Sequence, residues 1–305
     1  MLFENVGIVF SGQGSQFEGM GKELINREEY KTLEKIDKEI SEMVNGAEKV
    51  HLDKTSIAQP AIFLQSITLF KELSRKDAEF KHYSGLSLGE YTALCAAGKI
   101  DFEESLNLVC KRGKIMEEGI QGKGAMLAVL KSDVNEVQDI IDTVKGDEIL
   151  SISNLNSPGQ IVVGGSNKAI EAFEKEGTNR KIKRIVRLNV QGPFHTEFLK
   201  ESADKFESQL KKIQFIENEN EVYSNYKVKK HNKDNFVENL KNQMFSTVEF
   251  ENCVRKMIDN GCDTFIEIGP AKTLSGFIKK IDRGAIVYNI EKLEDVDVVY
   301  NCLKG

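Results

Sequence analysis

The sequence predicts an α/β protein in which a large domain with a parallel sheet carries a smaller inserted domain. Strand-like apolar runs occur among helical stretches near both ends of the chain, as at Val6–Phe10 and Thr264–Ile268. A Gly-x-Ser-x-Gly turn directly follows a third such run and precedes a helix. Between about residues 124 and 190 strands and helices alternate more tightly, which predicts the insertion.

Composition and charge narrow the class of protein. The 305 residues are 40% hydrophobic and 30% charged, which allows a substantial core and a well-solvated surface. The net charge of −6 argues against nucleic acid as the main partner. The five cysteines form no Cys-x-x-Cys pair, so neither a disulfide framework nor a metal site is predicted. No signal peptide or membrane-spanning apolar run is visible, so we expect a cytoplasmic protein without a membrane partner.

The first half of the chain predicts the elements that lead up to and away from the Gly-x-Ser-x-Gly turn. The expected strands are Val6–Phe10 and Phe80–Tyr83, and the expected helices are Ala58–Leu73, Glu90–Ala97 and Phe102–Ile120. Thr55-Ser56 has the character of a helix start, and Asp101 can cap the helix that follows it.

The inserted segment has the order β-α-β-β-α-β, which is typical of ferredoxin-like domains. Its expected strands are Ala125–Leu130, Ile149–Asn154, Gln160–Gly164 and Ile182–Leu188, and its expected helices are Val134–Val144 and Lys168–Lys175. We therefore place a ferredoxin-like subdomain at residues 124–190 and the large domain at 1–123 and 191–305. Helices at Glu197–Lys212 and Val248–Asn260 then precede the strand Thr264–Ile268.

The turn Gly85-Leu86-Ser87-Leu88-Gly89 has the setting of a nucleophile elbow, because it lies between a strand and a helix. A serine there is strained, so the residues two before and two after it must be small where the backbones pass. The turn lifts the Ser87 hydroxyl above the sheet and points the Leu88 amide at the oxygen of an attacked carbonyl. A glycine-bracketed turn that happens to hold a serine is the alternative, and the flanking elements favour a nucleophile.

A serine nucleophile needs a base, and the chain has four histidines. His195 lies in a Gly-Pro loop between a strand and a helix, where α/β proteins collect catalytic groups. We expect His195 to be the base rather than a surface histidine. His51 lies in a polar stretch and His231 in a lysine-rich loop, so both are expected on the solvated surface. His82, in the strand before the elbow, is expected to pack in the core or at the sheet edge.

The chain resembles the malonyl-CoA:acyl carrier protein transacylases over essentially its whole length. Six motifs carry the resemblance, in the order seen in that family: Gly12-Gln13-Gly14-Ser15-Gln16, Gly85-Leu86-Ser87-Leu88-Gly89-Glu90, Lys111-Arg112-Gly113, Asn156-Ser157-Pro158-Gly159-Gln160, Gly192-Pro193-Phe194-His195 and Glu267-Ile268-Gly269-Pro270. It implies a large α/β-hydrolase-like domain and malonyl transfer from malonyl-CoA to acyl carrier protein in fatty acid biosynthesis. Leu86 stands where many relatives carry histidine, so no auxiliary histidine is expected there.

The resemblance implies a ping-pong reaction through a malonyl ester of Ser87. His195 would take the serine proton, return it to the departing CoA thiol, and then deprotonate the phosphopantetheine thiol of the carrier protein. The family has no triad carboxylate; a backbone carbonyl, by position that of Gln243, would orient the histidine. The amides of Leu88 and Gln13 would form the oxyanion hole.

The resemblance also makes Arg112 the specificity residue, because a guanidinium can meet the malonyl carboxylate with two parallel hydrogen bonds. Without the resemblance, Arg112 would be interpreted as a surface residue of a charge run. Phe194 occupies the position that excludes an α-methyl branch in relatives, which favours malonyl over methylmalonyl. Met116 and Gln59 are expected to line the pocket, and Asn156 to shape a tight turn through its side chain.

The segment 179–187 is notably basic for an acidic protein. One interpretation is the solvated face of a strand, with Ile182, Ile185 and Val186 pointing inward. The other is a docking patch for an acidic carrier protein, in which complementary charge would raise the association rate. Binding of the CoA phosphates is a third interpretation.

Three other functions compete with malonyl transfer in fatty acid synthesis. A serine esterase or thioesterase shares the elbow, but it predicts a triad acid or an Asp-Gly dyad, and the chain has no Asp-Gly dipeptide. A non-catalytic carrier-docking subunit is disfavoured because Ser87, His195 and Arg112 occur together. A free-standing polyketide acyltransferase stays open. We expect malonyl-CoA and acyl carrier protein as partners, no metal or other cofactor beyond the substrate CoA, and a monomer.

Overall fold

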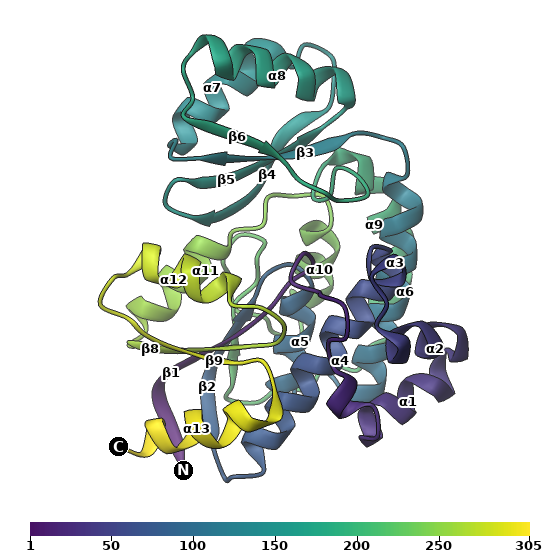
Figure 1. Ribbon diagram of the computed structural model, residues 1–305, viewed down its shortest axis with the longest axis vertical. Coiled ribbons are helices and arrows are strands. Elements are labelled where there is room, and N and C mark those ends of the chain that lie inside the picture. Colours follow the sequence, from purple (N-terminus) through teal and green to yellow (C-terminus); the bar gives the residue numbers. More distant parts are fainter.

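The computed structural model describes residues 1–305 and contains two sheets, each covered by helices (Figure 1). The larger sheet has five parallel strands in the order β7-β2-β1-β8-β9. They are β1 (Leu2–Phe10), β2 (Glu79–Gly85), β7 (Glu221–Val222), β8 (Thr264–Ile268) and β9 (Ile286–Ile290). The predicted parallel sheet is confirmed. Its central strand β1 is buried throughout Val6–Phe10, as its continuous apolar run requires.

The helices around the large sheet bury its apolar faces, and Figure 1 shows α11 and α12 on one side of the sheet and α13 on the other. These helices are α1 (Glu28–Ile36), α2 (Lys38–Gly46), α3 (Lys49–Leu52), α4 (Thr55–Ser74), α5 (Leu88–Ala96), α6 (Phe102–Ile120), α9 (Lys200–Leu210), α10 (Phe236–Gln243), α11 (Phe250–Asp259), α12 (Thr273–Ile281) and α13 (Leu293–Lys304). Asp101 caps α6 as expected, accepting from the amides of Glu103 and Glu104. None of the helices is both long and apolar enough to cross a membrane.

The smaller sheet is antiparallel, with the strand order β4-β5-β3-β6. Together with the chain order β3-α7-β4-β5-α8-β6 this is the predicted ferredoxin-like arrangement. Its elements are β3 (Ala125–Leu130), α7 (Val134–Val144), β4 (Leu150–Ser157), β5 (Gln160–Gly165), α8 (Asn167–Asn179) and β6 (Arg184–Arg187). Both helices cover the face that points away from the large sheet (Figure 1), and this layer has an apolar core of its own.

Main-chain hydrogen bonds join the small sheet to the rest of the molecule. The Leu155 amide donates to the Val248 carbonyl at 2.9 Å, and the Val248 amide donates to the Ser153 carbonyl at 2.8 Å. Thr247 adds a side-chain bond to the Ile152 carbonyl at 2.8 Å. The segment between α10 and α11 therefore extends the pairing of β4, and this contact attaches the small sheet to the large domain.

The basic segment 179–187 differs in part from its predicted form. Val186 does not point inward: 37% of it is exposed. The reason is the alternation of side chains on β6, because Ile185 already faces the core and adjacent residues point to opposite faces. Two of the basic side chains are engaged within the small layer, Arg180 with Asp139 and Glu176, and Arg187 with Glu174.

Candidate active site

Ser87 lies in the sharp turn between β2 and α5, with φ 53° and ψ −96°. A positive φ is strained for a residue with a side chain, and such strain concentrates at functional sites. Two glycines make the turn possible. A Cβ on Gly85 would collide with the backbone of Gly89, and a Cβ on Gly89 would collide with the Phe10 carbonyl at the end of β1. The strand, the helix and the neighbouring strand thus pass one another at backbone distance, and the serine hydroxyl is left facing the pocket.

His195 joins Ser87 to a main-chain carbonyl. Its Nε2 lies 2.8 Å from Ser87 Oγ, and its Nδ1 lies 2.7 Å from the Gln243 carbonyl oxygen. A carbonyl oxygen can only accept, so Nδ1 carries the proton and Nε2 is free to accept from the serine hydroxyl. The structure therefore brings together Ser87, His195 and Gln243 in one chain of hydrogen bonds, in the tautomer that a general base requires.

The surroundings of His195 keep its imidazole neutral. Burial and, to a smaller extent, the positive charge of Arg112 together lower the pKa of His195 to about 3, although the hydrogen bond to Gln243 acts in the opposite direction. A neutral imidazole is ready to accept a proton over the whole physiological pH range.

The depressed pKa of His195 should appear in the pH dependence of stability. In the unfolded chain His195 binds a proton below its ordinary pKa of 6.5, whereas in the folded protein it does so only below about pH 3. The free energy of unfolding therefore decreases as the pH falls from 6.5 towards 3. Between pH 7 and pH 5 we expect the unfolding free energy from urea titrations to fall by about 2 kcal/mol more in the wild type than in His195→Gln. Equal pH dependence in the two proteins would contradict this assignment.

Arg112 on α6 is completely buried, so its interpretation as a surface member of a charge run is wrong. The cause lies in the next residue. Gly113 has no side chain, and a Cβ there would lie 3.0 Å from the Ser56 Cα, so α6 packs closely on α4 at this point. The close approach carries Arg112 into the interior, where its guanidinium lies 4.7 Å from the centre of the Tyr91 ring.

The guanidinium of Arg112 ends beside the nucleophile. Nη1 donates to Gln59 Oε1 at 2.8 Å, and Nη2 donates to Ser87 Oγ and to Gln243 Oε1, both at 3.0 Å. Nε has no hydrogen-bond partner. Burial lowers the pKa of Arg112. Since a guanidinium keeps its proton throughout the accessible pH range, the site holds a positive charge that no side-chain carboxylate contacts directly.

A pocket opens in front of Ser87 and His195. Strands of the small sheet and loops and helices outside it contribute to its wall, which is formed by Gln13, Gln59, Leu86, Met116, Met126, Asn154, Asn156, Val162, Leu188, Val190 and Phe194. The expected pocket residues Gln59, Met116 and Phe194 are therefore all in place. Asn156 is not a turn former: its Oδ1 is buried without a partner and the residue lines the pocket.

Two main-chain amides are free at the mouth of the elbow. Leu88 is the first residue of α5, so its N–H has no acceptor within the helix, and the N–H of Gln13 in the N-terminal loop makes no hydrogen bond either. A Cβ on Gly12 would collide with the Leu86 carbonyl, so this loop passes directly over the elbow. The arrangement leaves two donors for an oxyanion at a helix N-terminus, where the helix dipole also favours negative charge.

The sequence reasoning missed a set of buried polar residues below the elbow. His231 is not on the surface: its side chain is wholly buried and lies 2.6 Å from Glu90, which is equally buried. Asn225 accepts from the Ser87 amide at 2.8 Å and donates to the Gly85 carbonyl at 2.9 Å, so it braces the turn. The lysines near His231 in the sequence predicted a solvated loop. The only sequence signal for the buried pair is that Glu90 directly follows the elbow.

The remaining histidines do not reach the pocket. His82 is buried on β2, between β7 and β1, where it contacts Glu221 and Tyr223, as expected for a packed strand residue. His51 on α3 is half-buried rather than solvated. No group of three or more histidine, cysteine, aspartate or glutamate side chains is arranged to hold a metal ion.

Comparison with known proteins places these features in one family. Residues 8–283 match the acyl transferase domain family. The malonyl CoA-acyl carrier protein transacylase of Bacillus subtilis (strain 168) is 35% identical over 308 residues, which cover 98% of this chain and 97% of that protein. The crystal structure of the transacylase of the same name from Clostridium perfringens superposes with a TM-score of 0.90, with 38% identity over 98% of this chain and 97% of that one.

A second similar structure contains a carrier protein. It is a malonyl-transacylase in complex with its type II polyketide acyl-carrier protein, with a TM-score of 0.89, 29% identity, and coverage of 98% of this chain and 100% of that chain. The nucleophile elbow, the histidine beside it and the inserted antiparallel sheet thus occur in a chain that matches these proteins over nearly its whole length. The chain belongs to the acyl transferase domain family and, within it, to the malonyl CoA-acyl carrier protein transacylases.

Proposed function

We propose that the protein transfers a malonyl group from malonyl-CoA to the phosphopantetheine thiol of an acyl carrier protein, through a malonyl ester of Ser87. The observation that carries this proposal is a buried arginine beside an activated serine. Arg112 Nη2 and His195 Nε2 lie 3.0 Å and 2.8 Å from the same Ser87 Oγ. The site thus combines a nucleophile and its base with a cation suited to an acyl group that carries a carboxylate.

The first half-reaction follows from these contacts. His195 Nε2 takes the hydroxyl proton as Ser87 Oγ attacks the thioester carbonyl, and the free amides of Leu88 and Gln13 are placed to stabilise the oxyanion that forms. The carbonyl of Gln243 holds the resulting imidazolium in orientation. His195 then returns the proton to the sulfur as the C–S bond breaks, and CoA leaves as the thiol.

Acylation itself prepares Arg112 for the substrate carboxylate. In the free enzyme Nη2 donates to the serine hydroxyl oxygen. An ester oxygen is a weaker acceptor than a hydroxyl oxygen, so formation of the acyl-enzyme releases this donor. Nη2 and the unpartnered Nε can then donate two parallel hydrogen bonds to the malonyl carboxylate. The carboxylate in turn neutralises the charge that otherwise opposes protonation of His195.

In the second half-reaction the phosphopantetheine thiol takes the place of the CoA thiol. Neutral His195 removes the thiol proton, the thiolate attacks the ester carbonyl, and the proton returns to Ser87 Oγ as the malonyl thioester leaves. Every group used in these steps comes from a single chain, which supports action as a monomer with acyl carrier protein as the transient partner. The similar transacylase seen bound to an acyl-carrier protein supports the same partner.

Intact-mass spectrometry tests this function directly. We expect brief incubation with malonyl-CoA to add one malonyl group to the enzyme, and peptide mapping to place it on Ser87. Addition of holo acyl carrier protein should move that mass to the carrier. An adduct lost only to water would indicate a hydrolase instead. The absence of an adduct with malonyl-CoA, together with one from another acyl-CoA, would reassign the donor.

A further inference from the structure

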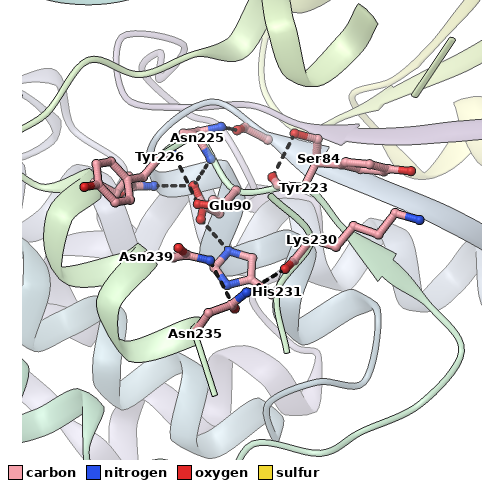
Figure 2. Close-up of polar contacts among 12 residues, drawn as sticks. Ser84, Glu90, Tyr223, Asn225, Tyr226, Lys230, His231, Asn235 and Asn239 are labelled. Atoms are coloured by element: carbon pink, nitrogen blue, oxygen red, sulfur yellow. Dashed lines mark hydrogen bonds and ion pairs between the residues drawn. The ribbon is translucent and has the colours of Figure 1, made fainter. Parts of the chain in front are cut away.

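A buried carboxylate lies directly behind the catalytic groups. Glu90, on the first turn of α5, exposes no surface, and Figure 2 shows its carboxylate between Asn225 and His231. Oε1 accepts from His231 Nε2 at 2.6 Å, and Oε2 accepts from the Asn225 main-chain amide at 2.8 Å. A third donor, Gln243 Nε2, reaches Oε2 at 2.8 Å. A carboxylate accepts hydrogen bonds and donates none, so it fits a position surrounded by three donors.

The third of these hydrogen bonds fixes the direction of an amide that touches the active site. Gln243 Nε2 faces Glu90 and the Ser87 carbonyl, and Gln243 Oε1 faces Arg112 at 3.0 Å. Rotation of the amide by half a turn would place its NH2 group against the guanidinium, donor against donor, and its oxygen against the carboxylate. Glu90 therefore selects the one orientation in which Gln243 can accept from Arg112.

Gln243 also supplies the main-chain carbonyl that orients the base, His195. The Gln243 main-chain oxygen accepts from His195 Nδ1 at 2.7 Å. Because the side chain of Gln243 is anchored on Glu90 and on the elbow carbonyl of Ser87, its backbone is held at the C-terminus of α10 with the carbonyl aimed at the imidazole. Both Arg112 and His195 are thus connected to Glu90 through one glutamine.

The side-chain amide of Gln243 also lies between two buried charges, those of Glu90 and Arg112. A guanidinium without a counter-charge is costly inside a protein, yet a carboxylate in direct contact would occupy the donors that a substrate carboxylate needs. Here Glu90 and Arg112 contact opposite ends of the Gln243 amide, so the negative charge is close while the donors of Arg112 stay directed at Gln59, at Ser87 and at the amide oxygen.

We propose that Glu90, held by His231, is a positioning residue that sets Gln243 and through it orients both the base His195 and the specificity residue Arg112. This inference rests on the proposed function, because its rate measurement uses the malonyl-enzyme. Glu90 does not contact Ser87 Oγ; it reaches Arg112 and His195 through Gln243, and it reaches the elbow backbone through Asn225.

A double-mutant cycle with Glu90→Met and Gln243→Met tests the connection. Both changes keep the side-chain length and remove the polar contact. At saturating malonyl-CoA, each should slow single-turnover acylation of folded protein at least about tenfold, because a misplaced base loses much of its effect. The double variant should be no more than about threefold slower than the slower single variant, because the two residues act through one contact. Glu29→Met is the matched control, since Glu29 is also buried but pairs with Lys71 away from the site.

An NMR measurement gives a second readout that does not depend on turnover. The Nδ1 proton of His195, bonded at 2.7 Å to Gln243, should give a downfield signal in the wild type and lose or shift it in Glu90→Met but not in Glu29→Met. The proposal would be overturned if folded Glu90→Met is acylated at a rate within twofold of the wild type. It would also be overturned if the rate losses of the two single variants multiply in the double variant. If Glu90→Met does not fold, unchanged acylation in Gln243→Met would overturn it. A wild type that forms no malonyl adduct contradicts the proposed function, while the Nδ1 signal still decides the positioning role.

Discussion

Ser87→Ala should form no malonyl-enzyme and should transfer malonyl groups at least about 10⁴-fold more slowly than the wild type. The alanine removes the atom that both His195 and Arg112 contact, so no covalent intermediate can form. The measurement is the intact mass after incubation with malonyl-CoA, together with the steady-state rate of transfer to carrier protein.

The matched control for Ser87→Ala is Ser84→Ala, three residues earlier on β2. Ser84 is also buried, and its hydroxyl donates only to the Tyr223 carbonyl, away from the pocket. We expect this variant to acylate at close to the wild-type rate. A malonyl adduct that persists in Ser87→Ala would place the nucleophile elsewhere and would contradict the role given to the elbow.

Arg112→Met should reverse the preference between charged and uncharged acyl groups. Two charge-assisted hydrogen bonds to a buried carboxylate contribute about 4 kcal/mol, so the ratio of malonyl-CoA to acetyl-CoA acylation rates should fall about 10³-fold. Most of the change should be a loss with malonyl-CoA, because a malonyl group would then bury its carboxylate without a partner. Competition between the two donors, followed by mass spectrometry of the acyl-enzyme, measures the ratio.

The neighbouring Lys111 provides the control for Arg112→Met. Lys111 precedes Arg112 on the same helix turn but reaches Gln209 on α9 at 3.1 Å, outside the pocket. Lys111→Met should leave the ratio of the two acyl groups unchanged. An unchanged ratio in Arg112→Met would mean that the carboxylate is recognised by another group.

The sequence was informative where local chemistry alone determines the structure. The glycines of the elbow predict a strained turn because the backbones pass too closely for a Cβ, and the structure shows those contacts at Gly85 and Gly89. The tight succession of short strand-like and helical stretches likewise predicts the four strands of the small sheet, and a capping aspartate predicts the start of α6. The residues that signal each of these features are neighbours in the chain, although the backbone that Gly89 approaches is that of Phe10 on β1.

The prediction failed where a side chain depends on distant partners. Glu90 and His231 are separated by more than a hundred residues of chain, and each alone is a polar residue that sequence patterns assign to solvent. Only the fold shows that they satisfy each other in the interior. Arg112 is a similar case, because a charge run gives no sign that Gly113 draws its helix against α4. The motif resemblance, rather than periodicity, located that residue.

The contribution of the inserted small sheet to the pocket wall has a consequence for how such enzymes can diversify. Met126, Asn154 and Val162 come from the small sheet, whereas Ser87 lies in the turn between β2 and α5 and His195 in the loop between β6 and α9. The inserted segment leaves and re-enters the large domain at adjacent points: a Cβ on Gly192 would lie 2.8 Å from the Ile120 carbonyl oxygen. Its hydrogen bonds to the segment around Val248 are largely main-chain and thus indifferent to side-chain identity. Exchange of the insertion by recombination would therefore reshape one wall of the acyl pocket in a single step, while the chain segments that carry Ser87, His195 and Glu90 lie outside the exchanged part.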